Sequence, residues 1–120
     1  MRGEQYLTRA EQYALVYEQG RSWASELVVM KASPNQLSFS RYGLSVGRRL
    51  GGAVVRNRVK RRMRQIMRAL PLEAGWDIIL IARPKAAAAS FAVLEKTIRG
   101  LVSRAGILAR EYEGACLRVN

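Results

Sequence analysis

The chain has 120 residues, of which 49% are hydrophobic and 25% charged, and its formal net charge is +12. These fractions are ordinary for a folded protein, and the length fits a single domain, residues 1–120, with one core. Histidine is absent, which excludes histidine bases and histidine metal ligands, and no apolar run approaches the roughly 20 residues of a membrane span.

The first predicted element is a helix from about Arg9 to Gln19. Thr8 and Glu11 have the spacing of a capping box, in which two side chains satisfy free amides of the first turn, and Gly20 provides the stop. On the residue pattern alone, the two tyrosines on one side of this helix are favoured as core residues. That side is formed, at spacings of three and four residues, by Ala10, Tyr13, Ala14 and Tyr17.

Two or three short strands are expected between this helix and the next. Residues 27–30 are the best candidate, a shorter strand is expected around Trp23, and residues 37–46 alternate between apolar and polar positions. Residues 33–35 have turn chemistry. The alternation slips near Gly43, which indicates a bulge or a close backbone contact. We expect these strands to pair as an antiparallel hairpin or meander.

Residues 48–68 are the most unusual segment, because nine of these 21 residues are Arg or Lys and none is acidic. Between Glu26 and Glu73 the chain has eleven basic side chains and no carboxylate. A solvated helix face normally mixes signs, because like charges three or four residues apart repel. Here the repulsion has no local compensation, so we expect the negative charge to come from a partner, and a nucleic-acid backbone is the first candidate.

A helix is predicted over residues 53–70, where Pro71 ends it. At about 100° per residue, an apolar stripe occupies one side, formed by Val55, Val59, Met63, Ile66, Met67 and Leu70. The opposite side, called the basic face below, is formed by Asn57, Lys60, Arg61, Arg64 and Arg68, with Arg56, Arg58 and Arg62 at the flanks. We therefore expect the helix to dock by its stripe and to present a basic face about 16 Å long.

The start of this helix is a second candidate anion site. Gly51 and Gly52 offer no side-chain cap, so backbone amides and the helix dipole favour an anion there, and Arg48 and Arg49 lie beside it. A solvated helix face and a membrane-surface helix are alternative interpretations. The 46-residue absence of carboxylates argues against the first, and the lack of Trp and Phe in the apolar stripe argues against the second.

Residues 76–82 form the most apolar run, which predicts a strand buried on both faces and ended by Pro84. Ser90 is expected to cap a last helix, which Gly100 and Gly106 weaken or interrupt. Its predicted stripe consists of Phe91, Leu94, Ile98, Leu101, Val102 and Ala105, and Trp23 and Trp76 are expected to be packing residues. The order of elements predicts an α+β fold with a single mixed sheet and packed helices.

Residues 43–65 closely resemble the signature of the bacterial ribonuclease P protein component. The specific part is the triplet Arg56-Asn57-Arg58 within Ala-Val-Val-Arg-Asn-Arg-Val-Lys-Arg. Residues 8–20 and 77–84 resemble the family's first helix and the strand after its basic helix, so the resemblance covers residues 6–110. It implies the order α-β-β-β-α-β-α with a left-handed β-α-β crossover, as in domain 2 of ribosomal protein S5.

The resemblance also implies a function. It points to the protein subunit of a ribonucleoprotein endonuclease that removes the 5′ leader from precursor tRNA. The RNA subunit would carry catalysis, so no catalytic residue is expected in this chain. Its expected partners are the catalytic RNA and precursor tRNA, with no membrane, and any protein partner is unknown. Mg²⁺ is expected through RNA and substrate phosphates, none being bound tightly by the protein alone; its position is unknown.

The resemblance assigns two groups of residues. The RNA-binding group contains the residues that match the family's basic helix, Arg56, Asn57, Arg58, Lys60, Arg61 and Arg64, and we add the basic residues beside them, Arg48, Arg49, Arg62 and Arg68. The second group lines a cleft between the first helix and the sheet, which in the family holds the single-stranded leader: Tyr13, Tyr17, Ser45 and Arg49. The two tyrosines stand where the family more often has Phe. Two further departures are Gly52, where many members have Asn, and Met30, at a strand position facing the cleft that can be aromatic and would then add a stacking contact.

Three rival functions share the basic character. A protein-only nuclease needs clustered carboxylates, but none of the nine acids of this chain lies in the basic segment and no D-x-D or E-x-x-D pair is present. A ribosomal or chaperone-like RNA-binding protein would have a similar composition, and only the signature at residues 43–65 separates it. A DNA-binding protein would place the basic helix in a major groove.

The cysteine content bears on cellular location. The single cysteine, Cys116, cannot form an internal disulfide, and the first residues include no apolar signal segment. Both features favour a cytoplasmic location. We expect Cys116 itself to be an inert residue of the tail.

Overall fold

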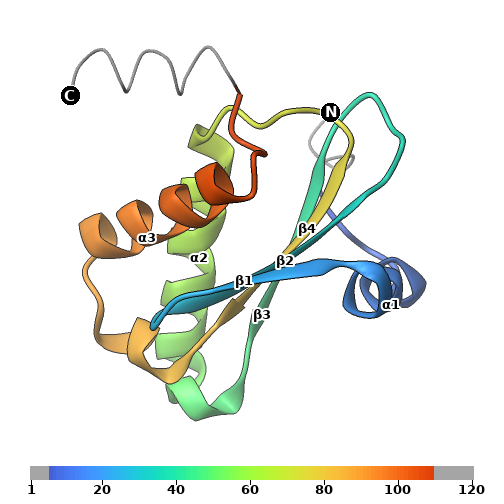
Figure 1. The fold of residues 1–120 in the computed structure, drawn as a ribbon. Coiled ribbons are helices and arrows are strands. Elements are labelled where there is room, and N and C mark those ends of the chain that lie inside the picture. Colours follow the sequence, from blue (N-terminus) through green and yellow to red (C-terminus); the bar gives the residue numbers. More distant parts are fainter. Residues whose placement is uncertain (1–5, 110–120) are drawn as a thin grey trace, which may run out of the picture.

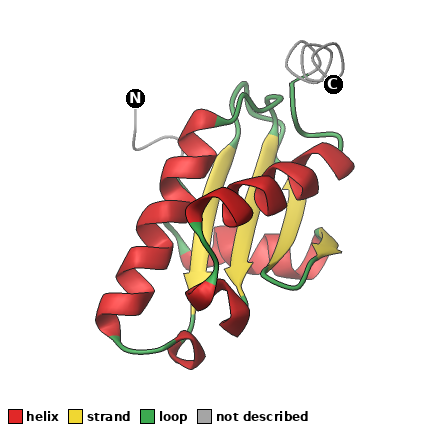
Figure 2. Ribbon diagram, turned by 90° about the vertical axis from the view of Figure 1, so that its left-hand side faces the viewer, coloured by secondary structure: helices red, strands yellow, loops and turns green. Residues whose placement is uncertain are grey.

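The computed structural model describes residues 6–109, which form three layers (Figure 1). Helix α1 (Ala10–Gln19) covers one face of a four-stranded sheet, whereas α2 (Ala53–Ala69) and α3 (Phe91–Arg104) lie together on the other face (Figure 2). This arrangement confirms the predicted α+β class with a single mixed sheet and the predicted order of helices and strands.

The sheet contains β1 (Arg21–Ala24), β2 (Val28–Pro34), β3 (Arg41–Val46) and β4 (Trp76–Ala82) in the order β1-β2-β4-β3. β1 and β4 both run antiparallel to β2, and β3 runs parallel to β4. The predicted hairpin is therefore right for β1 and β2 but wrong for β2 and β3, because β4 lies between them. An inner position suits β4, whose residues 77–80 are buried on both faces. The left-handed crossover from β3 through α2 to β4 stays a prediction.

The main core lies between the sheet and the helix pair α2 and α3. The sheet contributes residues such as Met30, Ile78 and Leu80, all fully buried. The predicted stripe of α2 is confirmed, since Val59, Met63, Ile66, Met67 and Leu70 are buried and Val55 is partly buried. Trp23 and Trp76 pack against this core as predicted. A smaller cluster of Leu7, Val16 and Ile79 holds α1 to the opposite face.

Helix α1 differs from its prediction in both cap and buried side. Gln12, rather than Glu11, reaches back, and its Oε1 accepts hydrogen bonds from the backbone amides of Thr8 (2.8 Å) and Arg9 (3.0 Å). The cap therefore lies one residue later than predicted. Val16 is the buried residue of this helix, whereas Ala10 and Ala14 of the predicted side are exposed.

Strand β3 begins at Arg41 rather than Leu37, because Asn35 organises the preceding residues into a loop. Its Oδ1 accepts from the amide of Leu37 (2.8 Å), and its Nδ2 donates to the carbonyl of Phe39 (3.3 Å) and to Asp77 (2.8 Å). Arg41 then donates to both carboxylate oxygens of Asp77, at 2.9 and 2.7 Å. This pairing raises the pKa of Arg41, and the sequence reasoning did not anticipate it.

Helix α3 begins as predicted, with Ser90 Oγ accepting a hydrogen bond from the amide of Val93 at 3.2 Å. Its buried side is Leu94, Ile98, Leu101 and Val102, but Phe91 is exposed, against expectation. Gly100 lies within the helix, whereas Gly106, with φ of +74°, follows its end in the left-handed conformation that glycine adopts readily.

Two short 3₁₀ helices were not predicted: η2 (Arg48–Leu50) and η3 (Pro84–Ala88). In the part of the chain that the structure describes, no helix is both long and apolar enough to span a membrane. Cys116 lies outside the described residues.

Candidate RNA interface

Helix α2 carries most of the predicted RNA-binding residues, and its burial pattern divides them into three rows. Asn57, Arg61 and Arg68 are exposed at the outermost part of the basic face. Lys60 and Arg64 are partly buried and face the N-terminal segment and β3, where both line a pocket with Tyr6 and Tyr42. Arg58 and Arg62 lie on the opposite flank, toward η3.

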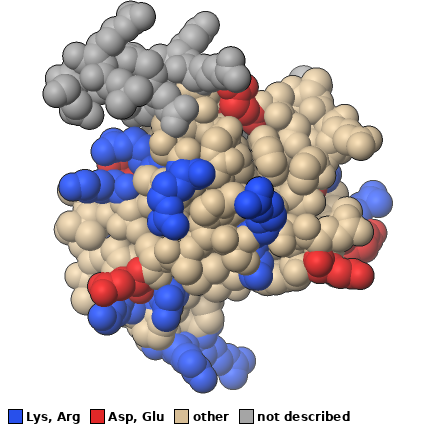
Figure 3. Space-filling model, viewed as in Figure 1, with Lys and Arg blue, Asp and Glu red and all other residues tan. Residues whose placement is uncertain are grey.

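No described carboxylate neutralises the basic side chains of α2. The ion pairs found among residues 6–109 join Arg41 to Asp77, Lys85 to Glu26 and Arg99 to Glu95. The surface seen in the view of Figure 1 is different in character, because acidic and basic side chains are interspersed on it (Figure 3). Within residues 6–109, therefore, no ion pair reduces the charge that the basic face offers to a partner.

Arg58 and Arg62 are partly committed to the protein itself. Arg58 Nη2 donates to the carbonyl of Ala87 at 3.0 Å, and Arg62 Nη1 donates to that of Ala89 at 3.1 Å. These bonds tie α2 to the connection between β4 and α3. The two arginines therefore hold η3 in place. Their predicted position at the flank of the basic face did not reveal this role.

The N-terminal end of α2 is open, as its glycines predict. Gly52 occupies the cap position, where no side chain bonds the first-turn amides. Gly51 has φ of +140°, a backbone conformation in which a side chain would be strained, so glycine is needed there. Arg48 and Arg49 are exposed on η2 immediately before this turn.

The predicted cleft residues Tyr13 and Tyr17 have different environments. Tyr13 is partly buried, its hydroxyl donates to the carbonyl of Leu7 (3.3 Å), and burial, with a smaller contribution from Tyr17, raises its pKa. Its ring lies so close to Gly43 that a Cβ at that position would collide with it. Gly43 is thus the close backbone contact that the slipped alternation indicated. Tyr17 is 45% exposed and keeps an accessible ring face.

Lys31 lies beside Tyr17 and was not among the predicted cleft residues. Its Nζ lies 5.9 Å from the ring centroid of Tyr17 and 2.9 Å from Ser22 Oγ. Met30, which was expected to face the cleft, is fully buried on the other side of the sheet. The alternation along β2 could have predicted this difference. Successive side chains of a strand point to opposite faces, and Met30 is more apolar than Lys31, so Met30 is the one expected in the core.

The other two predicted cleft residues are Ser45, which lies in β3, and Arg49, which lies in η2. Ser45 is partly buried in β3 and pairs with Ile81, a residue that packs against the α1 cluster. Ser45 therefore shares the α1 face of the sheet with Gly43, two residues away. Arg49 lies beyond the end of β3 in η2, where it is exposed.

An aromatic cluster at the outer edge of β3, where Tyr6 bridges to Tyr42, was also missed. Arg68 donates to the hydroxyl of Tyr6 from Nε (3.3 Å) and Nη2 (3.1 Å). The rings of Tyr6 and Tyr42 lie 5.0 Å apart, and the amide of Leu7 bonds the carbonyl of Tyr42 at 3.0 Å. The N-terminal segment therefore joins the edge strand to the basic face, a contact between residues 62 positions apart that no local pattern reveals.

Comparison with known proteins agrees with this architecture. A family model described as Ribonuclease P matches residues 1–106. The ribonuclease P protein component of Dehalococcoides mccartyi is 43% identical over 113 residues, which is 94% of each chain. That of Roseiflexus castenholzii is 42% identical over 105 residues, covering 85% of this chain and 86% of its relative.

Solved structures resemble the chain over most of its length. A Staphylococcus aureus RNase P protein mutant with defective mRNA degradation activity superposes with a TM-score of 0.85 at 25% identity, covering 90% of this chain and 93% of that one. The RNase P protein of Thermotoga maritima gives 0.74 at 29% identity, covering 82% and 96%. The sequence signature, the fold and these matches together place the chain in the ribonuclease P protein component family.

Proposed function

We propose that this chain is the protein subunit of a ribonuclease P ribonucleoprotein, which cleaves the 5′ leader from precursor tRNA with catalysis carried by the RNA subunit. Family membership supports the subunit role. The observation that carries the RNA-binding part is the basic face of α2, a 17-residue helix docked by its apolar stripe and free of described carboxylate partners. Such a face neutralises phosphates of a bound polyanion and releases the counterions of those phosphates.

Two surfaces of the protein would bind different RNA strands. The basic face and the open start of α2, with Arg48 and Arg49, would hold the catalytic RNA through its phosphates, for which the guanidinium fork is well shaped. The α1 face would hold the single-stranded leader, because Tyr17 offers a stacking face and Lys31 a cation beside it. A basic groove with stacking faces binds single strands with little sequence preference.

Mg²⁺ would be held by RNA and substrate phosphates rather than by this chain. Among the described residues, no three of the types His, Cys, Asp and Glu converge on one point. Asn57 on the basic face supplies one neutral oxygen, which is a poor donor set for a cation that prefers several oxygen ligands. The contribution of the protein is therefore to bind and orient two RNA molecules whose phosphates otherwise repel each other.

Reconstitution tests this function. The protein is combined with a bacterial ribonuclease P RNA and a precursor tRNA at low Mg²⁺, and release of the 5′ leader is measured with and without the protein. We expect faster cleavage when the protein is present and none from the protein alone. Cleavage by purified protein free of RNA would refute the assignment of catalysis, and no effect of the protein on the RNA would refute the subunit role.

A further inference from the structure

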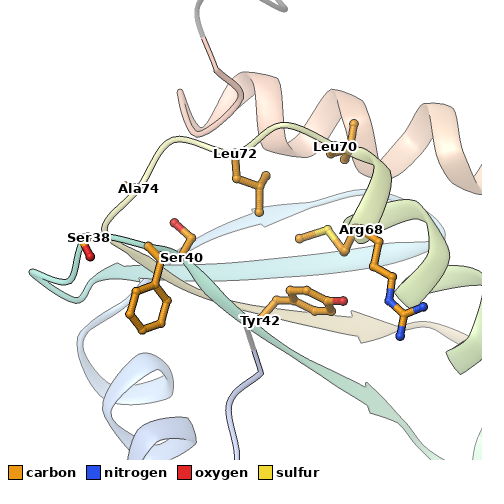
Figure 4. Close-up of a pocket in the computed structure, with 9 residues that line it drawn as sticks. Ser38, Ser40, Tyr42, Arg68, Leu70, Leu72 and Ala74 are labelled. Carbon is orange, nitrogen blue, oxygen red and sulfur yellow. The ribbon is translucent and has the colours of Figure 1, made fainter. Parts of the chain in front are cut away.

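A pocket at the C-terminal end of α2 adjoins the basic face, with which it shares Arg68, and has no role assigned so far. It has a volume of about 300 Å³ and lies between the end of α2, the start of β3 and the connection that follows α2 (Figure 4). Its lining is Ser38, Phe39, Ser40, Tyr42, Met67, Arg68, Leu70, Leu72 and Ala74. This volume lies at the lower end of the range for ligand sites, which fits one ring system rather than a whole cofactor.

The interior of this pocket is apolar and aromatic. Tyr42, Met67 and Leu70 are almost fully buried, and Phe39 is partly buried. Figure 4 shows Leu72 pointing toward Tyr42 and the hydroxyl of Tyr42 directed toward Arg68. That hydroxyl is buried beside Tyr6 and Arg68 but makes no hydrogen bond of standard geometry, so a polar ligand edge would offer it a better-aligned partner.

The rim of the pocket is positively charged. Arg68 is exposed there, and its two hydrogen bonds to Tyr6 leave other guanidinium donors free. None of the nine lining residues is acidic. Lys60 and Arg64 precede Arg68 at four-residue intervals, about 6 Å of helix axis each, and line an adjoining pocket that shares Tyr42.

We propose that this pocket takes one unpaired nucleobase of an RNA strand whose backbone follows Lys60, Arg64 and Arg68. An aromatic wall, an apolar floor and a cationic rim together match a base that continues into phosphates, and unpaired bases are what proteins stack in RNA. An acidic ligand would interact favourably only with the cationic rim, and a purely apolar ligand only with the apolar and aromatic interior. The inference rests on the proposed function, since it takes RNA as the partner, and adds a specific subsite to it.

The test compares Phe39→Ala with a matched control, Phe91→Ala, whose ring is exposed on α3. The backbone carbonyl of Phe39 that bonds Asn35 remains in the variant. Affinity is measured for ribonuclease P RNA alone and for precursor tRNA on the assembled holoenzyme. We expect Phe39→Ala to weaken one of these by about five- to 100-fold, the range of one lost stacking contact, and Phe39→Tyr to restore it. The arm that weakens identifies which RNA supplies the base.

The possible outcomes distinguish a failure of the proposed subsite from a failure of the proposed function. If Phe39→Ala behaves as Phe91→Ala in both arms while Arg61→Ala weakens binding, the subsite is wrong and the proposed function stands. If no variant changes binding because the protein does not bind either RNA, both fail together.

A direct observation does not depend on any variant. The methyl NMR signals of Met67 and Leu72 are followed while a single-stranded RNA decanucleotide is added to the wild-type protein, and again with an abasic decanucleotide. We expect these signals to shift only when bases are present. Unmoved methyl signals at saturating decanucleotide would overturn the subsite.

Discussion

Asp77 is an acid buried within an otherwise apolar strand, and it fixes where the edge strand β3 begins. Its carboxylate accepts two hydrogen bonds from Arg41 and one from Asn35, which also holds the loop before β3. A buried charge without partners is costly, so these three side chains form one unit. Arg41 is therefore a basic residue of the acid-free region that serves the fold, as Arg58 and Arg62 do in part.

Removing the Asp77 carboxylate should destabilise the protein strongly. Asp77→Ala leaves the Arg41 guanidinium without its acceptor, and we expect the free energy of unfolding to fall by about 3 kcal/mol, as for other broken buried ion pairs. Chemical denaturation measures this. Glu95→Ala, which breaks a more exposed helical pair with Arg99, should cost at most about 0.5 kcal/mol. Equal losses in the two variants would contradict the structural role given to Asp77.

At the scale of elements, α2 shows which features a sequence can reveal. Its stripe and basic face follow from a long, strongly periodic pattern, and both were predicted correctly. The hydrogen bonds of Arg58 and Arg62 to η3, and of Arg68 to Tyr6, could not be predicted, because they depend on segments distant in the chain. The pairing of β2 with β4 was missed for the same reason: local alternation fixes the face of a residue but not the neighbour of a strand.

Substitutions of two neighbouring arginines of α2 should have different effects, one on RNA binding and the other on stability. Arg61→Ala removes an exposed charge from the basic face, so we expect weaker binding to ribonuclease P RNA and an unchanged melting temperature. Arg62→Ala removes the hydrogen bond to Ala89, so we expect a loss of about 1 kcal/mol in unfolding free energy. Binding and thermal unfolding measured on both variants check this, and a reversed pattern would contradict the orientation of α2.

The close contact between α1 and β3 gives a third prediction. In Gly43→Ala the new Cβ would collide with the ring of Tyr13, so we expect a loss of about 1–3 kcal/mol in stability, as for overpacked sites, together with weaker leader binding. Gly47→Ala is the matched control, because its Cβ would meet no atom within 4 Å. Equal stability of the two variants would show that Tyr13 does not pack on Gly43.

For the whole molecule, the three layers separate the basic face of α2 from the α1 face of the sheet. Helix α2 lies on one face of the sheet and α1 on the other, and the free edge of β3 lies between them (Figures 1 and 2). Tyr42 on that edge contacts the N-terminal segment and lines pockets beside α2. One RNA on α2 and another along the α1 face could therefore approach each other at this edge without sharing a binding surface.

The central claim, that the basic face of α2 binds RNA through phosphates, is tested most directly by salt dependence. The affinity for ribonuclease P RNA is measured over a range of salt concentrations for the wild type and for the double variant Arg61→Ala, Arg64→Ala. We expect log affinity to fall steeply with log salt, and the slope to decrease by about 2 in the double variant, one for each phosphate contact removed. A slope near zero, or one that the double variant leaves unchanged, would contradict it.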